Sequence, residues 1–304
     1  MRIFKKTNFD FIAGRKIAYI VSAGLVLVSL AVILLRGISY GIDFKGGQEF
    51  VLEFPTAANV SETRAILTNA LGTQPEVKQF GLAQDLLIRT DASGDPEQIV
   101  NASISALTEA DPNNVPVVIK SDTVGPRFAE DLKRGALYSV ISALVVIFLY
   151  ILVRFKNWTF SLGAIAALAH DVIVTLGILT IANKLLPFSM DIDQNMIAAF
   201  LTIVGYSLND TVVIFDRIRE NKTVHKGSPF KEVVNRSVND TLSRTVITTG
   251  TTLFVVIVLF IFGGEVLKGF AFALLVGMIL GTYSSVWVAS SIVVDLQKKF
   301  NISK

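Results

Sequence analysis

The chain has 304 residues, of which 52% are hydrophobic and only 17% are charged, and its mean hydropathy is +0.57. Soluble domains contain about a quarter charged residues, so this composition indicates a membrane protein. The sequence has no cysteine, which excludes disulfides and thiolate metal sites, and its net charge of +3 gives no indication of a nucleic-acid partner.

The first predicted transmembrane helix covers residues 17–35, and the basic segment 1–16 precedes it. Crossing the hydrocarbon core takes about 20 apolar residues. This stretch contains no ionisable side chain apart from tyrosine. A signal peptide would end in a small-residue cleavage pattern, whereas here Arg36 follows directly, so we expect an uncleaved helix.

A glycine-rich segment follows at residues 41–47, GIDFKGG, and includes Gly41, Asp43, Gly46 and Gly47. A phosphate-binding loop would continue into G-K-[ST] and open a helix, and the sequence predicts neither. We interpret the segment as a turn that leads from the first helix into a β-sheet.

Residues 36–134 have the composition of a soluble domain. The patterns predict strands at 48–54, 76–80, 86–89 and 115–120, and helices at 61–71 and 95–110, with Ser61 as a candidate cap of the first helix. The order βαβ–βαβ predicts a ferredoxin-like α+β sandwich. Nothing in this domain resembles a catalytic centre, which favours a binding or spacer role.

Five further apolar stretches predict transmembrane helices at residues 135–153, 158–183, 195–215, 246–264 and 269–294. The region 135–294 therefore contains helices two to six, with a cytoplasmic loop at 216–245 and a tail at 295–304. In that loop, residues 228–240 predict an amphipathic helix along the membrane surface. The predicted fold class is a polytopic α-helical membrane protein with six transmembrane helices and an inserted α+β domain.

The distribution of Lys and Arg predicts the orientation. Seven of these residues lie between 216 and 245, whereas the two short loops on the other side contain only Lys184 and Lys268. Because cytoplasmic loops are enriched in positive charge, we expect both termini in the cytoplasm and residues 36–134 outside it.

Ionisable side chains inside a membrane are costly and indicate function. Asp210 lies in the fourth predicted helix, and Arg244 lies two residues before the fifth apolar stretch. Movement of Arg244 towards Asp210 would release a proton from the carboxyl group, and movement away would load one. The proton would then be the coupling ion, and we expect no cofactor or metal. A static salt bridge that pins two helices is the structural alternative.

Other polar and small residues in the spans have less specific meanings. His170 and Asp171 in the third helix, and Asn209 in the fourth, fit either a secondary relay or helix packing. The sixth helix has a small residue at every fourth position, including Gly277, Gly281 and Ser285. Such a stripe permits close helix contact, within the bundle or against a partner.

Four motifs together resemble the SecF family of bacterial protein-export membrane subunits. They are GIDFKGG at 41–47, AHD at 169–171, GYSLNDTVVIFDRIREN at 205–221 and SRT at 243–245. The six-helix layout with one outward domain is also similar to this family, so the resemblance covers essentially the whole chain.

The resemblance implies more than the residue patterns predict. The family belongs to the RND superfamily, so the resemblance implies an RND-type half bundle with a periplasmic domain. Its members pair with SecD in a twelve-helix bundle of the bacterial inner membrane. The pair acts beside the SecYEG channel, and YajC is a further candidate partner. It uses the proton-motive force to promote translocation of preproteins, which the periplasmic domain contacts. The family positions for proton conduction fall on Asp210 and Arg244.

Several alternatives to this hypothesis remain. Half of an RND exporter of small molecules or lipids would need a larger outward domain, and a scaffold without ion coupling stays open. An intramembrane aspartyl protease using Asp171 and Asp210 would need a G-x-G-D motif, which is absent before Asp210. Metal hydrolysis is disfavoured because the chain has two histidines and no H-E-x-x-H.

Overall fold

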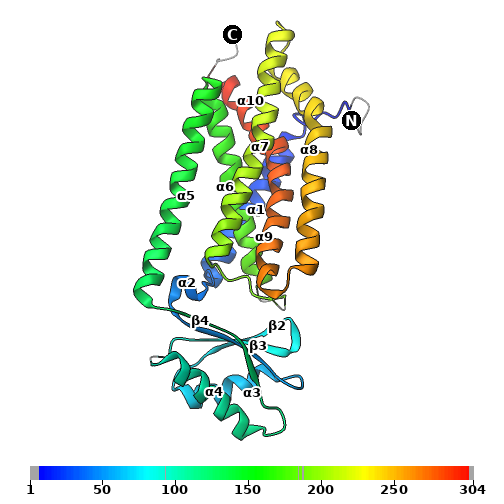
Figure 1. Cartoon of the computed structure of the whole chain (residues 1–304). Helices are drawn as coiled ribbons and strands as arrows, with labels where there is room; N and C mark the ends of the chain where they lie inside the picture. Colours follow the sequence, from blue (N-terminus) through cyan, green and yellow to red (C-terminus); the bar gives the residue numbers. More distant parts are fainter. Residues whose placement is uncertain (1–6, 93, 184, 187, 301–304) are drawn as a thin grey trace.

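The structure is a computed structural model that describes residues 7–92, 94–183, 185–186 and 188–300. Figure 1 shows a bundle of long helices above a small α+β domain, which forms a separate layer at one end. The first and last described residues lie at the opposite end of the bundle. We call the two ends the domain side and the terminal side.

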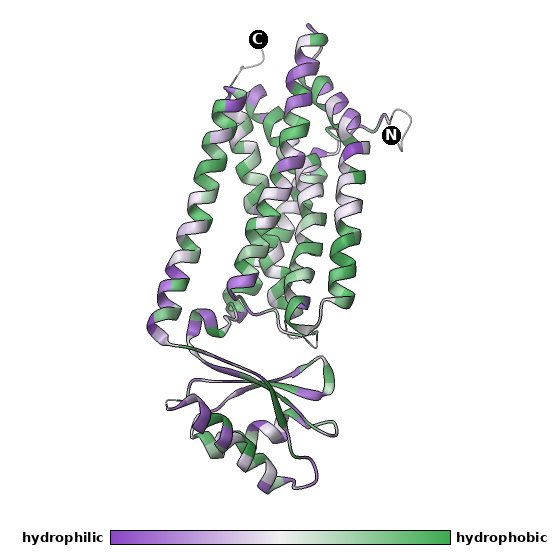
Figure 2. Ribbon diagram, viewed as in Figure 1, coloured by the Kyte–Doolittle hydropathy of each residue, from purple (hydrophilic) through white to green (hydrophobic). Residues whose placement is uncertain are grey.

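Within the described residues, six helical units are long and apolar enough to cross a membrane, as predicted. Figure 2 shows their apolar middles between hydrophilic ends. The first five are α1 (Arg15–Arg36), α5 (Pro126–Phe155), α6 (Trp158–Ala182), α7 (Gln194–Val224) and α8 (Phe230–Phe262). The sixth unit consists of α9 (Glu265–Ser284), the π-helical turn η1 (Ser285–Ala289) and α10 (Ser290–Lys299).

The region predicted as a cytoplasmic loop, 216–245, is almost entirely helical. Helix α7 continues to Val224 and α8 begins at Phe230, so residues 228–240 belong mostly to α8 and form no separate surface helix. No Gly or Pro interrupts the sequence from residue 230 to 249, so helical hydrogen bonding continues out of the membrane. Val234 and Val238 are buried in the same core cluster as Phe215, which holds the two extensions together.

The small domain has the predicted ferredoxin-like fold. Its elements are β1 (Gly47–Glu53), α3 (Val60–Leu71), β2 (Glu76–Phe80), β3 (Leu82–Thr90), α4 (Pro96–Ala110) and β4 (Val117–Val124). The strands pair antiparallel in the order β2-β3-β1-β4. Asn59, and not Ser61, caps α3, because its side chain accepts hydrogen bonds from the amides of Ser61 and Glu62.

The two faces of this sheet have different partners. Side chains alternate along a strand, so Phe50, Leu52 and Ile88 are buried in the domain core with Leu67 of α3. Both helices cover this face, on the side away from the bundle. Glu49 and Arg89 occupy intervening positions and therefore lie on the face towards the bundle.

The chain enters and leaves the domain at neighbouring points. Gly47 at the start of β1 pairs with Val124 at the end of β4. A Cβ atom at Gly46 would lie 3.0 Å from the Cα atom of Pro126, the first residue of α5. The connection from α1 and the connection to α5 are therefore in contact.

Candidate functional site

Asp210 lies on α7 inside the helical bundle, and its residue is only 3% exposed. The side chains of Thr249 and Arg244, both on α8, interact with its carboxylate. Its Oδ2 atom is buried and has no hydrogen-bond partner among the described residues. A buried carboxylate oxygen without a partner is costly unless a cation or a proton compensates it.

Arg244 is exposed on the terminal side of the bundle. Among the described residues, no ion pair joins it to Asp210, so this conformation does not contain the static salt bridge of the structural alternative. Arg244 lines a cavity of about 820 Å³ with Asp216 and Asp240. The two residues thus lie on neighbouring helices, as the sequence predicts, and the structure adds a cavity lined by several charged residues beside the arginine.

His170 and Asp171 contact each other although they are adjacent on α6. His170 Nδ1 lies 3.0 Å from Asp171 Oδ1. The other carboxylate oxygen of Asp171 accepts hydrogen bonds from Ser207 Oγ of α7 and Ser284 Oγ of α9, each at 2.7 Å. Asp171 thus joins three helices through buried hydrogen bonds, whereas Asn209 is exposed on α7 and takes no part in this network.

The small-residue stripe of the sixth helical unit faces α7. A Cβ atom would lie 2.3 Å from Ile203 Cδ1 at Gly277, and 2.8 Å from Ser207 Cβ at Gly281. Ser285 is fully buried at the start of η1, and its Oγ lies 2.8 Å from Thr211 Oγ1. The structure therefore places the stripe within the bundle, against α7, the helix that contains Asp210.

The GIDFKGG segment forms a junction with the domain-side start of α7. It contains one helical turn, α2 (Ile42–Lys45), which the sequence did not predict. Asp43 Oδ2 accepts a hydrogen bond from the amide of Gln194 at 2.9 Å, and the amide of Gly41 donates to the carbonyl of Ile192 at 2.9 Å. The segment therefore helps to cap the helix that contains Asp210.

Glycine is required at the end of this segment. Gly47 has a φ of 113°, and a Cβ atom there would lie 2.6 Å from the carbonyl oxygen of Thr90. Gly46 has a φ of 75°. Side chains rarely adopt such backbone conformations, so both glycines permit the tight entry into β1.

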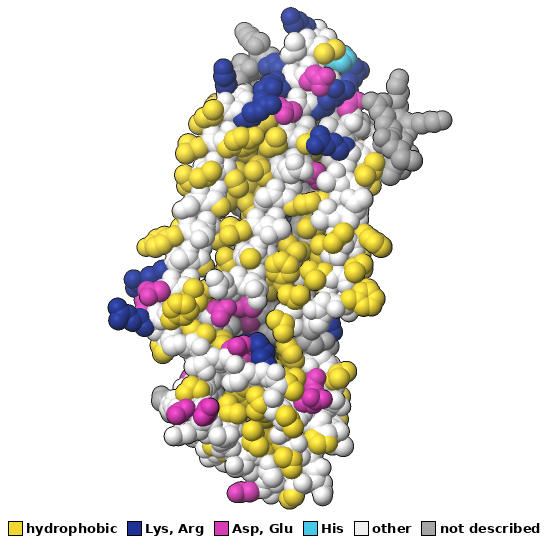
Figure 3. Space-filling view, in the orientation of Figure 1, with side chains coloured by type: hydrophobic (Ala, Val, Ile, Leu, Met, Phe, Trp, Pro, Cys, Tyr) yellow, Lys and Arg dark blue, Asp and Glu magenta, His cyan; other side chains and the backbone are white. Residues whose placement is uncertain are grey.

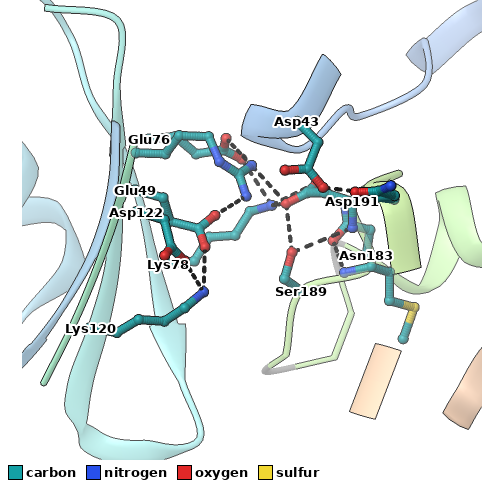
Figure 4. Close-up of polar contacts among 12 residues, drawn as sticks. Asp43, Glu49, Glu76, Lys78, Lys120, Asp122, Asn183, Ser189 and Asp191 are labelled. Atoms are coloured by element: carbon teal, nitrogen blue, oxygen red, sulfur yellow. Dashed lines mark hydrogen bonds and ion pairs between the residues drawn. The ribbon is translucent and has the colours of Figure 1, made fainter. Parts of the chain in front are cut away.

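A cluster of charged residues joins the small domain to the loop between α6 and α7 (Figure 4). Asp191 of that loop lies 2.9 Å from Arg89 Nη1 and 3.2 Å from Lys78 Nζ. Arg89 also pairs with Glu49 at 2.6 Å. We call Glu49, Lys78, Arg89 and Asp191 the junction cluster.

The junction cluster is largely shielded from water, since the side chains of Arg89 and Asp191 are 9% and 3% exposed. Burial alone would raise the pKa of Asp191, but Lys78, Arg89 and a hydrogen bond from Ser189 hold that pKa well below its usual range. Burial likewise opposes the charge of Arg89, whereas Asp191 and Glu49 raise its pKa above the usual value. Asp191 and Arg89 therefore remain ionised, and the cluster links the two layers of the molecule.

Sequence reasoning did not find the junction cluster. Arg89 and Asp191 are 102 positions apart, and each resembles an ordinary solvent-exposed charge when read alone. One indication in the sequence was that Glu49 and Arg89 alternate with the buried residues of their strands and so lie on the opposite face of the sheet. A second signal was Asp191 in a short loop between two transmembrane helices.

Comparison with known families gives two matches. Residues 103–299 match the family described as "Protein export membrane protein SecD/SecF, C-terminal". Residues 31–57 match the "SecD/SecF GG Motif". The second match contains the GIDFKGG segment and the beginning of β1.

Curated relatives are similar over nearly their whole length. "Protein translocase subunit SecF" of Rhodothermus marinus is 55% identical over 299 residues, which cover 98% of this chain and 96% of the relative. The protein of the same name from Escherichia coli O157:H7 is 35% identical, over 96% of this chain and 88% of the relative.

Two solved structures share the fold. SecDF from Thermus thermophilus, described as a translocon-associated membrane protein, is similar with a TM-score of 0.84 and 36% identity over 96% of this chain. SecDF in a super-membrane-facing form is similar with a TM-score of 0.71 and 33% identity over 99% of this chain. This chain spans 39% and 40% of those longer chains.

Proposed function

Because this chain belongs to the SecF family of protein translocase subunits, we propose that it is the proton-coupled half of a protein-export motor. The observation that supports proton coupling best is the buried carboxylate of Asp210, whose Oδ2 has no hydrogen-bond partner among the described residues. Arg244 lies one helix away, beside the cavity on the terminal side that several charged residues line. Both termini and this cavity face the cytoplasm in the proposed orientation.

Asp210 alternates between two compensated states in this mechanism. In one state a proton on the carboxyl group removes the charge, and in the other Arg244 moves inward and pairs with the carboxylate. Each proton that crosses the membrane supplies about 2.3 kcal/mol per 100 mV. The exchange therefore shifts α8 relative to α7 with energy from the proton gradient.

Movement of α7 reaches the outer domain through two contacts. Asp43 caps the start of α7, and the loop that leads into α7 contains Asp191 of the junction cluster. A displacement of α7 along its axis would therefore act on the domain at the GIDFKGG segment and at the sheet. This is how proton transfer would move the domain against an emerging preprotein.

A SecD subunit would pack against an exposed face of α7. Ala198, Thr202, Gly205 and Asn209 lie on one side of this helix and are all exposed, and nothing lies within 4 Å of a Cβ atom placed at Gly205. Small and polar residues are favoured at contacts between transmembrane helices, and polar side chains are costly against lipid. This face therefore suits a SecD helix close to Asp210, and SecYEG and YajC would associate with the assembled pair.

The edge of the domain sheet offers a contact for preprotein. β4 is an edge strand, and Val117 and Ile119 on it are 63% and 51% exposed. An exposed apolar edge strand can pair with an extended chain by adding a strand. Unfolded polypeptide leaving the channel would have this extended form.

The test is export into inverted membrane vesicles that contain the complex with SecD, with and without a proton gradient. Asp210→Asn and Arg244→Met should each abolish the stimulation by the gradient and leave gradient-independent export unchanged. Glu220→Gln is the matched control, since it makes the same chemical change at an exposed position of α7. Stimulation that survives both substitutions would favour the scaffold without ion coupling.

A further inference from the structure

A cavity of about 920 Å³ opens between α5 and the helices α6 and α7 on the domain side. The buried residues of α5 are Ala129 near its start and Ile151 and Phe155 near its end, so its middle does not pack into a core. Figure 1 shows α5 at the outer edge of the bundle. A cavity lined by this helix would therefore open on one side to the membrane.

The cavity walls are apolar and as long as one leaflet. They include Val140, Leu144, Leu168, Val172 and Val204. From Lys133 at the rim to Leu144, α5 rises about 16 Å at 1.5 Å per residue, and both residues line the cavity. Half of the hydrocarbon core is about 15 Å thick, so the cavity ends near the middle of the membrane.

The rim of the cavity is basic. Lys45, Lys133 and Arg134 line it together with one carboxylate, Glu130. Figure 3 shows Lys and Arg side chains gathered beside this part of the bundle. Lys133 Nζ lies 5.0 Å from the ring centroid of Tyr40, and Arg134 pairs with Glu130 at 2.6 Å on the exposed surface. Lys45 and Lys133 thus have no ion pair among the described residues and can bind an anion.

We propose that this cavity binds one phospholipid with an anionic headgroup from the leaflet on the domain side. An acyl chain lies between α5 and the pair α6–α7, and the headgroup phosphate lies at Lys45, Lys133 and Arg134. Basic pockets between transmembrane helices bind anionic headgroups in this manner. The site is independent of the proposed proton path, because neither Asp210 nor Arg244 lines it.

The shape of the cavity favours a lipid over a helix of a partner subunit. A transmembrane helix needs about 30 Å of apolar surface, twice the length of these walls. The exposed small and polar face of α7 offers a partner helix a different surface, because none of Ala198, Thr202, Gly205 and Asn209 lines the cavity.

Photo-crosslinking of the full complex with SecD, in nanodiscs of equal parts phosphatidylcholine and phosphatidylglycerol, tests the proposal. A photo-reactive amino acid at position 140 or 143, both in the cavity lining, should capture phosphatidylglycerol several-fold more often than phosphatidylcholine. The same amino acid at position 258, exposed on α8, should show no such preference.

The rim charges provide the second arm of the experiment. Each of Lys133→Gln and Arg134→Gln should lower the preference for phosphatidylglycerol by up to about fivefold and by a measurable amount, as expected for one basic residue at the membrane surface. Lys156→Gln, at the other end of α5, should not change it. Equal capture of both lipids, a preference insensitive to Lys133 and Arg134, or capture of the SecD chain at position 140 or 143 would overturn the proposal.

Discussion

Asp191→Asn should loosen the contact between the outer domain and the bundle. The substitution keeps the size of the side chain but removes the charge that Arg89 and Lys78 face at 2.9 and 3.2 Å. Arg89 retains Glu49 at 2.6 Å, and Lys78 retains Glu76 at 2.9 Å. Arg89 and Lys78 therefore each lose one ion-pair partner and keep another.

The size of the effect follows from this geometry. Removing one partner of a buried ion pair costs about 3–5 kcal/mol. Because Glu49 and Glu76 still face the two cations, we expect Asp191→Asn to cost about 2–3 kcal/mol, at or below the lower end of this range. Since about 1.4 kcal/mol is tenfold in an equilibrium constant, local opening of the junction should become roughly 30- to 140-fold more frequent.

Hydrogen exchange in the intact complex measures this opening. The amides of Gly41 and Ile192 are suitable reporters. They donate to the carbonyls of Ile192 and Ser39, and these bonds join the segment that leads into the domain to the loop that contains Asp191. Asp122→Asn is the control, because Asp122 is half exposed and its pair with Lys120 should contribute less than about 1 kcal/mol. Exchange in the control should match the unmodified chain.

A double substitution separates pairing from general damage. Replacing both partners of a buried pair with apolar residues of similar size is often nearly neutral. Asp191→Leu together with Arg89→Met should therefore open the junction far less than the sum of the two single changes. Unchanged exchange in Asp191→Asn, or strict additivity in the double variant, would refute the coupling that we assign to the cluster.

Three further predictions concern the packing and the charges. Gly277→Ala should lower the thermal stability by about 1–3 kcal/mol, because its Cβ would lie 2.3 Å from Ile203 Cδ1, whereas Gly250→Ala, with open space around it, should be neutral. Asp171→Asn should cost about 1–3 kcal/mol in a thermal-shift assay, since one of the buried hydroxyl donors or the imidazole loses its acceptor. The folded-state pKa of Asp191 is lowered, so its contribution to the stability of the junction is complete above about pH 4 and is lost as the pH falls towards the folded-state pKa. Hydrogen exchange at the junction, measured over an acid titration, should show this loss. The Asp191→Asn variant should no longer show this pH dependence.

The fold was predictable because its signals are local. Each transmembrane helix is defined by a run of apolar residues about as long as the hydrocarbon core. The α+β domain is defined by alternating strands and by helix starts such as Asp95–Pro96, where Asp95 accepts the amide hydrogen bond of Glu97. Residues 228–240 were one exception, because amphipathic periodicity does not distinguish a surface helix from the extension of a transmembrane helix.

The candidate site was predictable only in part. Asp210 was singled out because a charge inside an apolar run is conspicuous, and Arg244 because it precedes the next such run by two residues. Their role in proton transfer stays a prediction. The contact between His170 and Asp171 depends on side-chain rotamers, and helix geometry alone suggested that the two would point apart. The pairing of Arg89 with Asp191 depends on how a sheet docks on a distant loop, and no pattern within either segment specifies it.

The touching entry and exit strands of the outer domain have a mechanical consequence. Since Gly46 lies against Pro126, the two covalent connections act as a single pivot and not as two separated struts. Rotation about one pivot turns a small displacement near the membrane into a larger sweep of α3 and α4, which lie farthest from it. The junction cluster, which holds the sheet to the loop before α7, then sets how much force is needed before that sweep begins.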